Sequence, residues 1–202
     1  MGYTGHNVVF PDTPIDIKPS IDDSYENIDI KSVWPEAALI FTDEGSNEGW
    51  NSHLSIRPLG STKELYGGSF HQWPFCAIPP SGIIQTKLKQ REGASTQWFA
   101  YAYMKENTSY SLNGMDLGVI PPNTWTDKSI AGLNPNGRFA FIEMYHTLGL
   151  AHISARKNHS FFARYGQNAN HNWTICHVKN DAILELYCSV GSPTWLLLAE
   201  CH

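Results

Sequence analysis

The stretch His71-Gln72-Trp73-Pro74-Phe75-Cys76 recurs in this chain as His171-Asn172-Trp173-Thr174-Ile175-Cys176, and 171 − 71 gives an offset of 100 residues. Further stretches recur at offsets between 97 and 100 residues: those that begin at Ala38, His53, Tyr66 and Trp98 face those at Arg138, His152, Tyr165 and Trp195. A drift of this size is what a short loop insertion produces. The period is too long for a solenoid unit, so the recurrence predicts a duplicated domain.

The repeat divides the 202 residues into two domains. We predict a first β-sandwich at 24–104 and a second, which repeats it, at 105–202. Each is about the size of a small sandwich. Before them, residues 1–23 carry prolines that prevent a helix, and this segment is predicted to be an extended proline-rich arm that docks onto a neighbouring surface or a partner subunit. Its prolines are Pro11, Pro14 and Pro19.

Strand patterns dominate the chain after this arm. Apolar and polar residues alternate over 53–58 and 83–88, and aromatic residues recur at every second position after Phe99. A period of two places one face of each strand in the core and the other in solvent. The predicted fold is all-β, with two tandem jelly-roll-like β-sandwich domains that arose by internal duplication.

Composition narrows the classes of partner. Charged residues make up 16% of the chain, below the roughly 25% of an average globular protein. The net charge of −5 argues against nucleic acid as a partner, because binding to phosphates needs a basic surface. The N-terminal residues do not resemble a signal peptide, and no apolar run reaches the roughly 20 residues of a membrane span. We therefore expect no membrane insertion.

The repeated histidines and tryptophans have two interpretations. His71 and Trp73 lie two residues apart, so on a strand they share one face, as do His171 and Trp173. This pattern fits a repeated platform on which a sugar ring stacks. It also fits two core tryptophans, since large aromatic side chains dominate core burial. We favour the core interpretation, and we extend it to Trp98 and Trp195.

Candidate chemistry is weak elsewhere in the sequence. Five histidines of the second half show no spacing typical of a metal site: His146, His152, His159, His171 and His177. No nucleophile elbow or phosphate-binding glycine loop is present. Asp43-Glu44 and its counterpart Glu143-Met144 are interpreted as solvated loop acids, although an acid pair for glycoside hydrolysis stays an alternative. The sequence thus predicts no catalytic, metal or cofactor-binding residues and no cofactor.

The four cysteines fall into two groups. Cys76 and Cys176 are repeat equivalents in strand-like runs, and we expect both in the core. Cys188 and Cys201 have no counterpart in the first half, and their spacing leaves a disulfide open. Reduced thiols are the expectation for a protein made in a cytoplasm.

Several stretches resemble virion proteins of tailed bacteriophages. The resemblance lies in residues 25–38, with a proline turn followed by an aliphatic strand, and in 55–61 and 98–101. The second half keeps it weakly at 125–130 and 195–198. The resemblance covers most of both repeats and brings no catalytic residues. It implies a β-sandwich of a phage tail, fibre or capsid surface.

From these observations we expect a non-enzymatic structural or adhesive virion protein, made in the host cytoplasm. Its partners are expected to be copies of itself and other virion proteins, with a host-surface glycan as a further candidate. The first alternative is a lectin-like carbohydrate-binding module. The second is a β-sandwich glycan hydrolase, which the sequence favours least.

Overall fold

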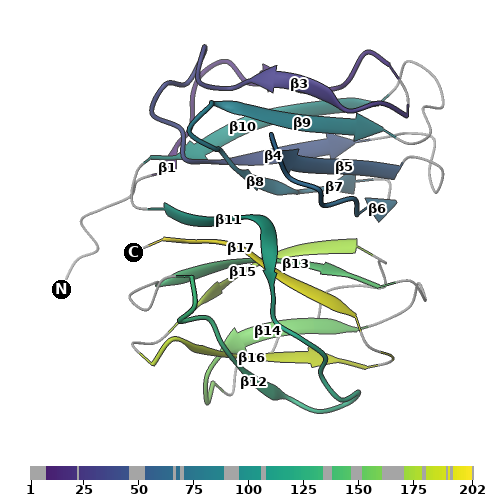
Figure 1. The fold of residues 1–202 in the computed structure, drawn as a ribbon, viewed down its shortest axis with the longest axis vertical. Coiled ribbons are helices and arrows are strands. Elements are labelled where there is room, and N and C mark those ends of the chain that lie inside the picture. Colours follow the sequence, from purple (N-terminus) through teal and green to yellow (C-terminus); the bar gives the residue numbers. More distant parts are fainter. Residues whose placement is uncertain are drawn as a thin grey trace. The chain divides into compact units, whose positions relative to one another are not determined.

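The computed structural model describes residues 8–21, 23–45, 53–65, 67–68, 71–88, 96–105, 108–133, 138–146, 152–160, 171–178, 181–189, 191 and 193–201 (Figure 1). Within these ranges the chain is built from antiparallel strands, turns and bends, and no helix occurs. The predicted all-β fold class is therefore confirmed, and its architecture is sandwich-like.

The chain divides into two compact units. The first comprises Met1–Thr62 and Ser69–Thr108, and the second comprises Lys63–Gly68 and Ser109–His202. The division near Thr108 lies close to the border predicted after Met104. The short segment Lys63–Gly68 is the exception, because it groups with the second unit although it lies within the first in sequence.

Two sheets build the first unit (Figure 1). One has the order β1-β10-β4-β7, with β2 also paired to β10 and β8 to β4. Its strands are β1 (Val8–Val9), β2 (Ile15–Asp16), β4 (Leu39–Gly45), β7 (His71–Gln72), β8 (Phe75–Ala77) and β10 (Gln97–Met104). The other has the order β3-β9-β5, with β3 (Glu26–Asp29), β5 (His53–Pro58) and β9 (Ile83–Leu88). The short strand β6 (Gly67–Gly68) lies in the segment that groups with the second unit.

The second unit also has two sheets. The order of one is β11-β17-β13-β15, with β11 (Thr108–Asp116), β13 (Phe139–Tyr145), β15 (His171–His177) and β17 (Thr194–Cys201). The order of the other is β12-β16-β14, with β12 (Thr126–Ser129), β14 (Ile153–Lys157) and β16 (Ile183–Cys188). One apolar core contains residues of both sheets, among them Ile142, Ile153, Leu186 and Trp195.

Strand order and hydrogen bonds correspond between the units. The N–H of Ile17 donates to the Trp98 carbonyl at 2.9 Å, and the N–H of Leu117 donates to the Trp195 carbonyl at the same distance. Both tryptophans are fully buried, which confirms their predicted core role. The register of the pair β4–β10 shifts between Ala100 and Ala102, and the register of the pair β13–β17 shifts between Phe141 and Ile142. An internal duplication is compatible with this correspondence.

A pair of cation–aromatic contacts follows the same correspondence. The guanidinium of Arg57 lies 3.6 Å from the Tyr25 ring centroid, and that of Arg156 lies 3.9 Å from the Trp125 ring centroid. Arginine over an aromatic face is attracted by the ring quadrupole. Tyr25 and Trp125 directly precede β3 and β12, while Arg57 and Arg156 lie in β5 and β14, so each contact joins two parts of one sheet.

The N-terminal segment packs on the first unit along its described part. β1 and β2 both pair antiparallel with β10, and Ile17 is fully buried. Phe10 and Ile21 are exposed. Ile17 therefore belongs to the core of the first unit, and we expect deletion of this segment to uncover that core. Docking of the exposed residues onto a partner stays a prediction.

Candidate functional site

The structure brings each repeated histidine against its tryptophan. The ring centroids of His71 and Trp73 lie 4.4 Å apart, and those of His171 and Trp173 lie 4.0 Å apart in a stacked arrangement. The expectation of a shared strand face is confirmed for His171 and Trp173, which both lie in β15; Trp73 directly follows β7 and contacts His71 from there.

The core interpretation of Trp73 is wrong. Its side chain is 58% exposed, whereas the neighbouring Gln72 and Pro74 are buried. Side chains alternate across a strand, so His71 and Trp73 share the face that points away from the core. Trp173 is half-buried on β15. Alternation predicted which residues share a face, but it did not show which face packs into the sandwich.

A carboxylate completes each pair. Asp43 Oδ1 contacts Nε2 of His71, and Glu143 Oε1 lies 2.7 Å from Nε2 of His171. Both acids lie within strands β4 and β13, so the interpretation as loop acids is corrected. Each acid precedes its histidine by 28 residues, a shared spacing that the sequence contained as a signal. We call Asp43, His71 and Trp73 the first cluster, and Glu143, His171 and Trp173 the second cluster.

The second cluster is buried and carries an additional cation. Glu143 and His171 have side chains 1% and 0% exposed, and Nζ of the buried Lys63 contacts Oε2 of Glu143. Burial alone raises the pKa of Glu143, but the charge of Lys63 and the hydrogen bond from His171 outweigh it and lower that pKa to about 2. Tyr145 packs edge-on against the His171 ring at 5.8 Å. The carboxylate is thus held ionised between two donors.

The first cluster faces solvent. The side chains of Asp43 and His71 are 44% and 49% exposed. Tyr101, at the register shift of β10, is exposed beside them, and its pKa is raised by burial and by the charge of Asp43. An aromatic face, a carboxylate and an imidazole are therefore presented together at one surface of the first unit.

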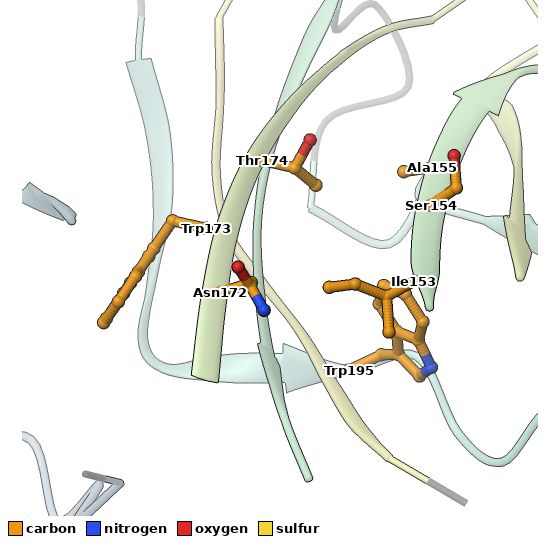
Figure 2. Close-up of a pocket in the computed structure, with 7 residues that line it drawn as sticks. All are labelled: Ile153, Ser154, Ala155, Asn172, Trp173, Thr174 and Trp195. Atoms are coloured by element: carbon orange, nitrogen blue, oxygen red, sulfur yellow. The ribbon is translucent and has the colours of Figure 1, made fainter. Parts of the chain in front are cut away.

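A cavity of about 90 Å³ lies in the second unit between β14, β15 and β17 (Figure 2). Figure 2 shows the Asn172 and Thr174 side chains on the opposite side of β15 from the Trp173 ring, which points away from Ile153. The remaining lining residues are Ser154, Ala155 and Trp195. Trp173 of the second cluster thus borders the cavity, although its ring points away from Ile153.

The two buried core tryptophans differ in their indole partners. Nε1 of Trp98 donates to Oγ1 of Thr42 at 3.1 Å. In the second unit the corresponding position holds Ile142, which offers no acceptor. Within the described part of the chain, the buried Nε1 of Trp195 has no hydrogen-bond partner.

The remaining histidines and cysteines do not add a site. His146 is buried, whereas His152, His159 and His177 are exposed. Among the described residues, no group of three His, Cys, Asp or Glu side chains could hold a metal ion. Cys76, Cys176 and Cys188 are buried, which confirms the core role of the first two, and burial raises the pKa of the Cys176 thiol to about 12. The Cys201 side chain lies outside the described residues, so the Cys188–Cys201 disulfide stays open.

No family model matches the chain, and no curated protein or solved structure matches it. In the described ranges, no helix has the length and hydropathy needed to cross a membrane.

Proposed function

We propose that this chain is a non-enzymatic adhesive protein of a virus particle, and that it binds its target through the first cluster. The virion setting rests on the sequence resemblance to tailed-phage proteins. The adhesive role rests on the exposed Trp73, which is held against His71 while Asp43 anchors the imidazole. Tryptophan and tyrosine are enriched at the centres of binding surfaces, where they supply large contact area.

The second cluster supports a structural role and not a catalytic one. A general acid must carry a proton near neutral pH, but the pKa of Glu143 is about 2 because Lys63 and His171 both stabilise its charge. Its two oxygens are already engaged by these donors. The cluster therefore contributes a buried ion pair that fixes the Lys63 segment within the second unit.

Two measurements test this proposal. Mass photometry is expected to show closed symmetric oligomers, since a repeated subunit on a particle multiplies weak contacts by avidity. Binding of the labelled oligomer to host cells is expected to fall on Trp73→Phe and on Trp73→Ala, and to persist on Trp125→Phe, which makes the same change as the first variant in the other unit. A strict monomer that hydrolyses a polysaccharide would contradict the proposal.

A carbohydrate ligand is the second candidate, favoured by the exposure of Trp73. The apolar face of a pyranose stacks on an indole ring, and neighbouring carboxylate and imidazole groups can bind its hydroxyls. A glycan array probed with the wild-type chain and with Trp73→Ala tests this candidate. A signal that survives the substitution excludes the first cluster as the sugar site.

A further inference from the structure

We propose that the first cluster binds the ammonium group of a lysine that is carried on an extended segment of a partner protein. This inference rests on the proposed adhesive function and specifies the ligand of that same site. Its basis is the comparison of the two clusters, because the second already holds such a ligand from its own chain.

The clusters are built alike. Each has an acid on the central strand β4 or β13, a histidine 28 residues later, and a tryptophan two residues after the histidine. In both, the imidazole Nε2 contacts one carboxylate oxygen and the tryptophan ring packs on the imidazole. The positions also agree in register, since Gly45 pairs with His71 and Tyr145 pairs with His171.

The difference lies in the other carboxylate oxygen. In the second cluster, Nζ of Lys63 binds Oε2 of Glu143. Within the described part of the chain, Oδ2 of Asp43 has no hydrogen-bond partner, and this carboxylate is partly exposed. The first cluster therefore presents, toward solvent, the acceptor that an ammonium group fills in the second.

The chemistry of the site favours lysine over other ligands. An anion is disfavoured by the charge of Asp43, whereas a cation gains from that charge and from the face of Trp73. Arginine binds carboxylates best through two parallel hydrogen bonds, which need both oxygens, but Oδ1 of Asp43 is already engaged by His71. A lysine ammonium is a point charge that needs one oxygen.

The segment that carries Lys63 indicates the form of the partner. Residues 61–65 have no regular structure and lead into the short strand β6. β7 is the last strand in its sheet order, so an extended chain can approach the first cluster along that side. A lysine flanked by small or polar residues, as in Ser61-Thr62-Lys63-Glu64, fits this approach.

The test uses the full chain and a synthetic peptide with the sequence of residues 59–68. Its binding is followed by the NMR signal of the Trp73 indole N–H, assigned by Trp73→Phe. We expect saturable shifts that weaken about tenfold when the lysine is acetylated and about tenfold on Asp43→Asn, because the charged hydrogen bond is lost in both cases. Asp127→Asn, at an exposed position of β12, is the matched control and should leave binding unchanged.

Equal binding of the acetylated peptide, or no shift with either peptide up to millimolar concentration, would overturn the lysine assignment. The proposed adhesive function has a separate readout in the cell-binding assay. A glycan that shifts Trp73 while the peptides do not would refute the lysine ligand and retain the adhesive role. Cell binding that persists in both Trp73→Ala and Asp43→Asn would refute the lysine ligand and the adhesive role together.

Discussion

Replacing Lys63 by methionine tests the structural role of the second cluster. The substitution leaves Glu143 buried, with His171 as its remaining hydrogen-bond donor among the described residues. Removing one partner of a buried ion pair destabilises proteins by about 3–5 kcal/mol, because an uncompensated charge is left in the interior. The pKa of Glu143 points in the same direction: burial alone raises it, but the charge of Lys63 and the hydrogen bond from His171 lower it to about 2.

The same pKa fixes the sign of the pH dependence. The folded carboxyl has a pKa below its unfolded value of 4.5, so its contribution to stability is fully present above about pH 4.5. That contribution is lost as the pH falls toward 2. In Lys63→Met the loss should begin at a higher pH, because the cation that lowers the pKa most is absent.

Urea unfolding at pH 7, followed by tryptophan fluorescence, measures the effect. Lys105→Met is the matched control, because Lys105 pairs with Glu36 at the surface and such pairs contribute about 1 kcal/mol or less. The double variant Lys63→Met/Glu143→Gln should recover part of the loss, since no buried charge remains. A Lys63→Met protein that unfolds at the same urea concentration as Lys105→Met would refute the reasoning.

Three further predictions concern the cores and the thiols. Trp195→Ala should destabilise the second unit by about 3–5 kcal/mol in chemical unfolding, whereas Trp73→Ala should cost less than about 1 kcal/mol because that ring is exposed; equal losses would contradict the placement of Trp73. Ile17→Ala should destabilise the first unit by about 2–5 kcal/mol, and an unchanged unfolding midpoint would show that the N-terminal segment does not pack there. Cys176 should stay unmodified by a thiol reagent at pH 8 in site-resolved mass spectrometry, because burial raises its pKa to about 12, and rapid labelling without unfolding would disprove it.

The class of fold was predictable because it depends on local patterns. Alternation of apolar and polar residues is a property of short segments, and it predicted strands such as β9 and β10. The buried positions of Trp98 and Trp195 followed from their recurrence in strongly apolar strands. These inferences needed no knowledge of which strands pair.

The candidate site was predictable in part. The recurrence showed that His71 and Trp73 form a unit with a counterpart at His171 and Trp173, and the structure confirms the contact within each pair. Their acids were visible in the sequence but were interpreted as loop residues. Strand pairing places Glu143 opposite Trp173, and that register depends on contacts between distant segments.

The amino-acid sequence by itself determines that the same three residue types occur twice, since each copy has an acid, a histidine and a tryptophan at equal spacings. Which copy is exposed and which is buried could be determined only from the tertiary structure. Lys63 lies 80 residues from Glu143, and no spacing rule links them. A side chain becomes buried only when another part of the chain covers its face of the sheet, and the two faces of a strand have the same period. The fold therefore makes one cluster a buried ion pair and leaves the other partly exposed.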